Sequence, residues 1–565
     1  MPTITIKAAE GDRYIEFESG RSLREVLDST PFRVRSGCRG TGACGLCRVQ
    51  IIGDGAAEPN PAELIYLSEK QIASGMRLAC QIWPEGNLQV SIPRRESAAS
   101  WRAMAARSRV FPVVSSSLPE CPGEPYGVAI DLGTTHISIS FYCLSTGQWF
   151  AGRRGLNPQR THGTDIMARL VAAHESPETA LALRRSVVDA IGSAIMDVAT
   201  SEGICGEQVV KAALVGNTAM LGLLSGRNSH LLLQPSYWMR PIDCLPEDPG
   251  ELRADWGIHP EAQVEILRPL AGFVGSDLLA GVFAEKLIED EPGKLFIDFG
   301  TNSEISLWDG ETLWVTSAAG GPAFEGCGIS CGSPAEPGAI YRVCVSGQAG
   351  PELAQRDGSG CVPAVFKSNA AGLDLEFRTI DDDNPLGLCG SGIIDLIACL
   401  LESGVITRMG RFSSGVPNAT ILLLNGDRQA LQLTKRDVDV FQRAKAAIFS
   451  GVKVLLAKAA MSEREIRSVF VAGAFGRFLN RESAAAVGLL PELGEKTPKG
   501  AVELCGNSAL KGCEELLMSP GAADAIEDLR NRARIVNLAQ CEEFDDFFLE
   551  GLYLGRWAGH NVDRQ

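Results

Sequence analysis

Residues 1–93 alternate polar and apolar positions in short runs, as the strands of a small sheet do. A turn at Gly11 separates the first two runs, and Ser22 precedes apolar residues at helical spacing, which predicts a short amphipathic helix. The predicted strands are Thr3–Lys7, Tyr14–Phe17, Cys47–Ile52 and Asn87–Ile92. This pattern predicts a compact mixed-sheet domain of the β-grasp type.

Residues 94–125 interrupt the alternation. The segment is rich in Ser, Ala, Arg and Pro and has no sustained strand period, so we interpret it as a linker between domains. The sequence around Trp101–Arg107 also allows a short helix. The alternative interpretation is a surface excursion of the first domain.

Beyond Tyr126 the chain alternates apolar strands with helical stretches, and the pattern occurs twice. Residues 126–142 and 294–308 share one design, in which an apolar strand ends in Asp-x-Gly-Thr and an alternating strand follows. Each half also contains a later apolar strand that breaks at glycine, at 213–220 and at 469–476. This repeated order predicts a duplicated α/β core like that of an ATPase.

The composition narrows the class of protein. A chain of 565 residues is long enough for several domains, and its 45% hydrophobic content is ordinary for a folded protein. The net charge of −16 disfavours nucleic acid and anionic membranes as partners. The chain start lacks the basic and apolar blocks of a secretory signal, and no apolar run of about 18 residues exists to span a bilayer. We therefore expect a cytoplasmic protein without a membrane partner.

Four cysteines have the spacing of iron–sulfur ligands. Three share one glycine-rich loop, as Cys38-x5-Cys44-x2-Cys47, and Cys80 follows later in the chain. Four thiolates suit a [2Fe–2S] cluster, and the interleaved glycines allow the positive-φ backbone that wrapping around the sulfides requires. The alternatives are a structural zinc site, whose ligands usually come as two close pairs, and buried thiols without a metal.

Two short turns have the composition of phosphate-binding loops. In each, an aspartate at a strand end can hold Mg²⁺, and the backbone N–H groups and hydroxyls beyond it can approach phosphate oxygens. The first turn contains Asp131, Gly133, Thr134 and Thr135, and the second contains Asp298, Gly300, Thr301 and Asn302. One such turn is a weak signal, but two at matching places predict that they clamp the triphosphate of Mg-ATP from both sides.

Further residues near these turns are candidates for roles in ATP hydrolysis. Glu304 is a candidate general base, because strand alternation places it on the face of Asn302. His136, beside the first turn, is better interpreted as a strand histidine than as a catalytic one. The chain contains no G-x4-G-K-[ST] sequence, which excludes a P-loop enzyme.

Three small-residue segments are candidates for contact with the nucleotide. One ends an apolar strand, where an adenosine can lie against the backbone, and another begins a helix whose N–H groups suit an anion. The segments are Gly473, Ala474, Phe475 and Gly476; Gly390, Ser391 and Gly392; and Gly320 and Gly321. For the helix start, tight packing without a ligand is the alternative.

These motifs resemble those of a known superfamily. The two aspartate turns and VAGAFG at 471–476 are similar to the phosphate and adenosine motifs of acetate and sugar kinases, heat-shock chaperones and actin, which have two ribonuclease-H-like lobes. Joined to a ferredoxin-like segment, they resemble the reductive activators of corrinoid proteins over almost the whole chain. Further matching segments are Asn157–Gln159 with Gly163 and Asp165, Val215–Met220, Ala271–Gly275, Gly321–Gly326 and Ala444–Ile448.

The resemblance implies an organisation and a reaction. The organisation is a [2Fe–2S] ferredoxin-like domain at 1–93, a linker at 94–125, a middle region at 126–205 implicated in dimerisation, and an actin-like ATPase domain at 206–565. The reaction is ATP-dependent one-electron reduction of a partner protein's Co(II) corrinoid to Co(I), which restores methyl transfer. It implies a homodimer and an external low-potential electron donor. No D-x-H-x-x-G motif occurs, so the corrinoid should belong to the partner.

Two other functions fit the same motifs. A chaperone- or kinase-like ATPase would use the cluster only as a redox sensor. An ATP-driven activator of another low-potential reductase is the second alternative. Activators of that kind in this superfamily carry a [4Fe–4S] cluster at a dimer interface instead of a fused ferredoxin domain, which disfavours it.

Overall fold

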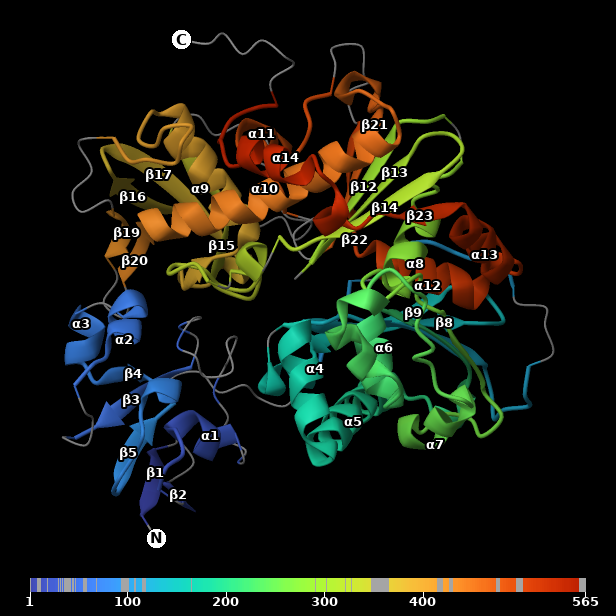
Figure 1. The fold of residues 1–565 in the computed structure, drawn as a ribbon. Coiled ribbons are helices and arrows are strands. Elements are labelled where there is room, and N and C mark those ends of the chain that lie inside the picture. Colours follow the sequence, from blue (N-terminus) through green and yellow to red (C-terminus); the bar gives the residue numbers. More distant parts are fainter. Residues whose placement is uncertain are drawn as a thin grey trace. The chain divides into compact units, whose positions relative to one another are not determined.

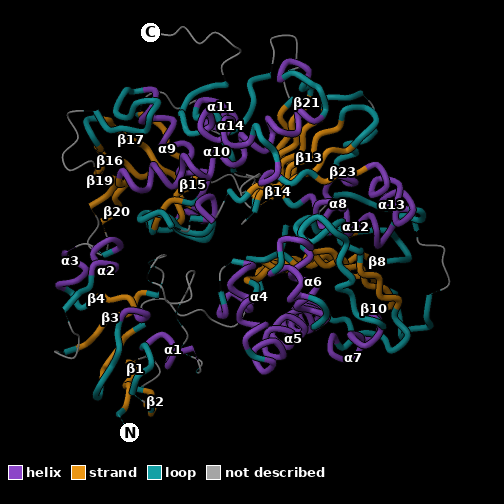
Figure 2. The backbone as a smooth tube through the Cα atoms, viewed as in Figure 1, coloured by secondary structure: helices purple, strands orange, loops and turns teal. Residues whose placement is uncertain are grey.

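The computed structural model describes residues 2–557 with gaps. The residues outside the description are 1, 8–11, 18, 29, 31, 33, 35–41, 43, 44, 46, 54–57, 68, 93–100, 106, 107, 114–117, 164, 290, 301, 321, 327, 347–364, 414–419, 426–429, 474–477, 494–500 and 558–565. The chain divides by its internal contacts into two units, Met1–Asp277 with Cys513–Pro520, and Leu278–Gly512 with Gly521–Gln565. Figure 1 labels the elements and Figure 2 colours them by type.

The N-terminal residues form the predicted β-grasp sheet. Its described strands lie in the order β2-β1-β5-β3-β4, with β1 parallel to β5 and the other neighbouring pairs antiparallel. Ile4 and Ile6, which alternate inward along β1, are fully buried in one hydrophobic cluster with Leu23 of α1. The elements are β1 Thr3–Lys7, β2 Arg13–Glu16, α1 Leu23–Asp28, β3 Arg48–Ile52, α2 Pro61–Tyr66, α3 Glu69–Ala73, β4 Met76–Leu78 and β5 Leu88–Ser91. The ferredoxin-like fold expected of this segment is confirmed.

A second sheet of the first unit has the described strand order β11-β10-β7-β8-β9-β6. Strands β11, β10 and β7 are parallel, whereas β8, β9 and β6 continue as an antiparallel meander. Every residue of β7 is buried, which explains its continuous apolar run. The strands are β6 Arg102–Ala103, β7 Tyr126–Leu132, β8 His136–Cys143, β9 Trp149–Leu156, β10 Val209–Gly216 and β11 Gln263–Ile266; the helices are α4 Ile166–Glu175, α5 Pro177–Glu202, α6 Thr218–Ser225 and α7 Leu252–Trp256.

Part of the predicted linker is attached to this sheet. Strand β6 pairs with β9, and the buried ring of Phe111 lies 5.2 Å from the ring of Tyr142 on β8. The helix that the sequence allowed around Trp101–Arg107 is therefore wrong at residues 102 and 103, because strand pairing takes up their backbone groups.

The second unit repeats the architecture of the first. Its largest described sheet has the order β22-β21-β12-β13-β14-β23, in which β22, β21 and β12 are parallel and β13 and β14 form the meander. The first five strands of the two sheets therefore pair in the same way, whereas β23 is parallel to β14 and β6 is antiparallel to β9. The predicted duplication is confirmed. The elements are α8 Ser276–Ala284, β12 Lys294–Phe299, β13 Ser303–Trp308, β14 Leu313–Ala318, β21 Ser468–Gly473, β22 Val502–Gly506, α12 Ser508–Met518, α13 Ala522–Arg532 and β23 Ala533–Ile535. The first two residues of α8 and the part of α12 from Cys513 onward belong to the first unit.

The remaining elements of the second unit surround the long helix α10. A described four-stranded sheet has the order β16-β17-β15-β18, and β19 and β20 form a hairpin. The bounds are β15 Ala339–Val345, β16 Phe366–Ala370, β17 Leu373–Thr379, β18 Gly387–Leu388, α9 Gly390–Glu402, β19 Thr420–Asn425, β20 Ala430–Thr434, α10 Lys435–Lys458, α11 Arg481–Ala486 and α14 Phe544–Gly551. None of the helices in the described part of the chain combines the length and apolarity needed to cross a membrane.

Polar side chains of α10 hold the C-terminal segment that follows α14. Gln442 Nε2 donates to Leu552 O and Lys445 Nζ donates to Tyr553 O, both at 2.6 Å. Lys445 is 1% exposed, and this burial lowers its pKa from 10.5 to about 7. A buried amine of this kind makes the stability of the second unit depend on pH.

We expect Lys445→Met to flatten that dependence. Between pH 7 and 10 the unfolded chain binds a proton at this amine that the folded chain lacks, so stability rises with pH by up to about 1.4 kcal/mol per unit. Below pH 7 the amine is protonated in both states, so the cost of burying its charge destabilises the folded chain in full. Scanning calorimetry across pH 7–9.5 should show a smaller rise in melting temperature for Lys445→Met than for the wild type. The exposed Lys458 of the same helix provides the control variant Lys458→Met; equal slopes in all three proteins would contradict the prediction.

Candidate functional site

Strand pairing brings two of the four predicted cluster cysteines together. Cys47 immediately precedes β3, and Cys80 lies on the 3-10 turn Ala79–Gln81 that follows β4. Because β3 and β4 are antiparallel neighbours, the Ala79 N–H donates to Cys47 O at 2.8 Å. Both cysteine side chains are buried.

Two glycines of the predicted cluster loop pack closely against α2 and against the turn that carries Cys80. Gly42 and Gly45 have φ angles of +80° and +65°, and a Cβ at Gly45 would lie 2.5 Å from the Tyr66 ring. Glycine is therefore required for this packing. Cys38 and Cys44 lie outside the described residues, and within the described part of the chain no group of three potential metal ligands gathers. Adjacent buried thiols beside a tight glycine loop fit a [2Fe–2S] cluster, and the complete ligand set stays a prediction.

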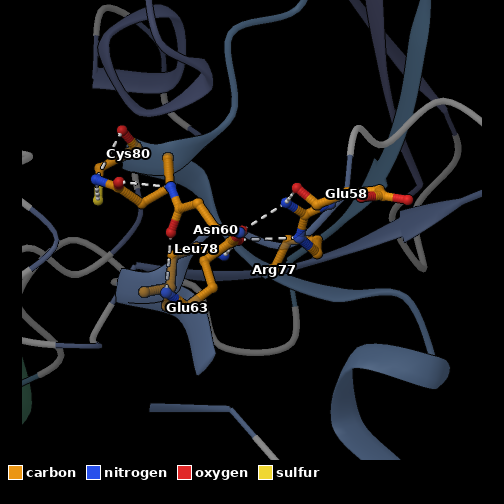
Figure 3. Close-up of polar contacts among 7 residues, drawn as sticks. Glu58, Asn60, Glu63, Arg77, Leu78 and Cys80 are labelled. Atoms are coloured by element: carbon orange, nitrogen blue, oxygen red, sulfur yellow. Dashed lines mark hydrogen bonds and ion pairs between the residues drawn. The ribbon is translucent and has the colours of Figure 1, made fainter. Parts of the chain in front are cut away.

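A buried ion pair fixes the strand that leads to Cys80. Arg77 donates from Nε and Nη2 to the Glu63 carboxylate at 2.9 and 2.5 Å, and both side chains are almost fully buried. Glu63 also accepts the N–H groups of Leu78 at 2.9 Å and Asn60 at 3.1 Å (Figure 3). Removing one partner of such a pair costs about 3–5 kcal/mol. The pair therefore ties α2 firmly to β4.

The carbonyl groups of the first predicted phosphate turn are held by two side chains that follow it in sequence. Asn157 Nδ2 donates to Gly133 O and the Asn157 N–H donates to Thr135 O, both at 2.9 Å. Arg169 Nη2 donates to Thr134 O at 2.8 Å. Protein donors therefore fix the backbone of this turn through its carbonyl groups, and its N–H groups and hydroxyls are the donors that could contact an anion.

A third side chain orients the Thr134 hydroxyl. Asn217 Nδ2 donates to Thr134 Oγ1 at 2.7 Å, so the hydroxyl hydrogen of Thr134 points toward another acceptor. Asp131, buried near the end of β7, lies opposite Ser138 on β8. The first turn thus presents one carboxylate and one oriented hydroxyl.

The second predicted phosphate turn carries two carboxylates. Asp298 on β12 and Glu304 on β13 lie directly opposite each other, and both are half-buried. Ser317, opposite Glu304 on β14, donates its hydroxyl to Glu304 Oε1 at 3.5 Å. Gly300 turns tightly here, since a Cβ would lie 3.0 Å from Asn302 O. Thr301 lies outside the described residues.

Parallel pairing places the predicted adenosine segment beside this turn. Gly473 of β21 lies opposite Phe299 of β12, with a φ of +92°. A Cβ at Gly473 would lie 2.0 Å from Phe299 O and 2.6 Å from Asp298 Oδ1. The structure therefore joins two segments that are far apart in sequence. Ala474, Phe475 and Gly476 lie outside the described residues.

The start of α9 is explained by packing. Gly390, Ser391 and Gly392 are buried, and a Cβ at Gly392 would lie 2.2 Å from Ile340 O of β15. The N–H groups of Gly392 and Ser391 donate to the sulfur of Cys389, whose pKa burial raises to about 11. These contacts favour a tight helix start, and a ligand role for these three residues stays a prediction. Gly320 packs near Ile448, and Gly321 lies outside the described residues.

Sequence reasoning gave no role to the side chains that shape the first turn. Asn157 and Asn217 each cap a helix that begins after a strand, which is a recognisable signal, but Arg169 sits inside α4 without one. His136 is half-buried on β8. Desolvation, and next the positive charges of Arg154, Arg160 and Arg102, hold its pKa well below the usual range. The interpretation of His136 as a strand residue rather than a catalytic one stays a prediction.

Known protein families match three consecutive parts of the chain. The profile of the 2Fe–2S iron–sulfur cluster binding domain matches residues 7–85. The RACo middle region matches residues 126–290, and the C-terminal domain of RACo, the ASKHA domain, matches residues 293–560. The chain belongs to the RACo family. In sequence, the boundary between the two RACo matches falls between β11 and β12, each of which belongs to a different one of the two duplicated sheets.

Individual relatives agree with this RACo assignment. The "Corrinoid activation enzyme RamQ" of Eubacterium limosum is 28% identical over 479 residues, which are 80% of this chain and 74% of the relative. The "[Co(II) methylated amine-specific corrinoid protein] reductase" of Methanosarcina barkeri is 26% identical over 440 residues, 75% and 76% of the two chains. A solved "Reductive activator for corrinoid,iron-sulfur protein" shares the fold, with a TM-score of 0.65, 24% identity and 98% of each chain covered.

We expect Gly473→Ala to disrupt the second turn of this RACo-family protein. A methyl group there would meet Phe299 O and the Asp298 carboxylate, so both must shift. The matched control is Gly506→Ala on the neighbouring strand β22, where φ is +71° but nothing lies within 4 Å of a Cβ. The left-handed backbone alone should cost each variant about 1–2 kcal/mol. Calorimetry should show a larger loss of stability for Gly473→Ala than for Gly506→Ala; equal losses would contradict the steric account.

Proposed function

We propose that this chain is an ATP-dependent reductive activator that passes one electron to the Co(II) corrinoid of a partner protein and produces Co(I). The proposal is supported by one observation above others. A single RACo-family chain joins a ferredoxin-like fold with adjacent buried thiols to a duplicated core with an aspartate turn in each half. The relatives named for corrinoid activation and Co(II) corrinoid reduction support the same reaction.

The energetics explain why both modules occur in one chain. Each 59 mV of unfavourable potential costs a factor of ten for one electron, so a gap of about 180 mV corresponds to roughly 4 kcal/mol. ATP can offset this cost only if it changes the affinity of the chain for the Co(II) and Co(I) forms of the partner unequally. Nucleotide binding and partner binding must therefore be coupled.

Different residues serve electron transfer and ATP hydrolysis in this proposal. Cys38, Cys44, Cys47 and Cys80 hold a [2Fe–2S] cluster, which supplies the electron when bound. Both aspartate turns serve the nucleotide, because Asp131 and Asp298 end their strands where a carboxylate can hold Mg²⁺. The oriented Thr134 hydroxyl donates to a phosphate oxygen, and Glu304, beside Asp298, positions or deprotonates the attacking water.

The assembly around this reaction is also a proposal. An external low-potential donor reloads the chain, and the corrinoid remains bound to the partner protein. We propose that the chain forms a homodimer through residues 126–205. The actin-like ATPase domain then comprises residues 206–565. The family resemblance supports these assignments.

The reaction is tested by mixing the reduced protein anaerobically with candidate Co(II) corrinoid proteins and following the absorbance of Co(I). We expect Co(I) to accumulate with Mg-ATP and to be at least tenfold slower without it. Cys80→Ser should abolish the reduction and keep ATP hydrolysis, whereas Cys205→Ser, a change at an exposed cysteine, should alter neither. Reduction at the same rate without ATP, or zinc in place of iron and sulfide in the purified protein, would contradict the proposal.

The carboxylates of the two turns are tested separately. Asp298→Asn, Glu304→Gln and Asp131→Asn should each lower ATP hydrolysis by roughly 10²-fold or more, since each removes a charge or proton acceptor at the phosphates. Visible spectra should show an unchanged cluster, because the ferredoxin-like domain has its own hydrophobic core. Glu311→Gln, at an exposed position after β13, is the matched control. Normal hydrolysis in all three turn variants would place the phosphate site elsewhere.

A further inference from the structure

Gln81 places a hydrogen-bond donor on a predicted cluster ligand. It follows Cys80 on the 3-10 turn after β4, and its Nε2 lies 3.3 Å from Cys80 Sγ and 3.3 Å from Cys80 O. Nothing in the cysteine spacing requires a glutamine at this position. The cysteine motif alone therefore does not explain why Gln81 contacts Cys80.

The direction of the Gln81 amide is set by a neighbouring helix cap. Asn60 caps α2, and its Oδ1 accepts the Glu63 N–H at 3.0 Å, so its Nδ2 must face the other way. That Nδ2 donates to Gln81 Oε1 at 2.8 Å. With its oxygen on Asn60, the Gln81 amide can present only its N–H₂ group to Cys80 Sγ.

The cap itself is anchored in the interior of the domain. Glu63, which is fully buried, accepts the Asn60 N–H and is held by the buried Arg77 through two hydrogen bonds (Figure 3). The loop that carries the other cysteines also approaches Gln81, because a Cβ at Gly42 would lie 3.0 Å from Gln81 Nε2. The donor is therefore held between a fixed cap and a close-packed loop.

We propose that Gln81 sets the reduction potential of the cluster by donating a hydrogen bond to the Cys80 thiolate. This rests on the proposed function, in which Cys80 is a cluster ligand. Uptake of one electron from the external donor adds one negative charge to the cluster and its thiolates, while no bond breaks and no proton moves. An N–H donor at a thiolate stabilises the more negative form, so Gln81 raises the potential. It favours loading by the external donor at the expense of driving force toward the corrinoid.

The proposal is tested by redox titration of the full-length protein, followed by visible absorption and EPR. Gln81→Met keeps the length of the side chain and removes the donor. Asn60→Asp keeps the acceptor that caps α2 and removes the donor that orients Gln81. Both variants should have a lower midpoint potential than the wild type. We expect a shift of up to about 59 mV, which is a tenfold change in the ratio of reduced to oxidised cluster. Gln89→Met, a change at an exposed glutamine of β5, should leave the potential unchanged. A Gln81→Met potential equal to that of the wild type would overturn the proposal.

A second measurement needs no variant. The wild-type protein is labelled with ¹⁵N in glutamine side chains, reduced and examined by pulsed EPR. A resolved coupling to side-chain nitrogen supports the contact, and its absence overturns it. Iron and sulfide analysis of the same sample separates the two levels of the account. If iron and sulfide are absent, both the cluster assignment and the role of Gln81 are wrong. If the cluster is present but the nitrogen coupling is absent, only the role of Gln81 is wrong.

Discussion

An aspartate near the end of a buried strand can serve a ligand only if the chain beyond it turns within a few residues, and glycine meets this steric constraint in both duplicated sheets. At Gly133 a Cβ would lie 2.7 Å from His136 O, and at Gly473 it would lie 2.0 Å from Phe299 O. In the first sheet the closest approach is made by a glycine of the turn itself. In the second sheet it is made by Gly473 of the neighbouring parallel strand, and Gly300 of the turn is less crowded, since a Cβ there would lie 3.0 Å from Asn302 O. The shared strand order of the two sheets is what places both aspartates at equivalent positions.

The two halves have diverged around this shared frame. Asp131 faces a serine across the strand pair, whereas Asp298 faces Glu304. The first turn is instead held from outside, by Asn157 and Arg169. The first turn is therefore shaped by side chains from other elements, whereas the second turn has a pair of facing carboxylates.

Features carried by local patterns could be predicted from the sequence. Alternation located β1, β2, β3 and β5 of the ferredoxin-like sheet but not the three-residue strand β4, and repeated Asp-x-Gly-Thr turns indicated the duplication. Features that depend on register between distant strands could not be predicted. The approach of Gly473 to Asp298 requires β21 to pair in parallel with β12 at one particular offset. The direction of the Gln81 amide depends on a cap 21 residues earlier, through contacts that no periodicity encodes. Strand β6 was missed because two paired residues leave no alternating pattern.

That short strand also bounds the movement of the ferredoxin-like domain. With residues 102 and 103 paired to β9, the chain from the end of β5 at Ser91 to this attachment is about ten residues, which span at most roughly 35 Å. A segment of only about ten residues therefore connects the ferredoxin-like domain to the second sheet. In the proposed reaction, such a tether would maintain a high effective concentration of the cluster near a corrinoid partner.

The central claim is that the electron reaches the corrinoid from the cluster of this chain and that ATP controls the transfer. A single-turnover experiment tests it most directly: the reduced protein, freed of external donor, is mixed with Co(II) corrinoid partner and Mg-ATP and freeze-quenched for EPR. The account predicts that the reduced-cluster and Co(II) signals decay together, at one rate and in equal amounts, and that both persist without ATP. Loss of the Co(II) signal while the cluster signal stays constant would contradict it.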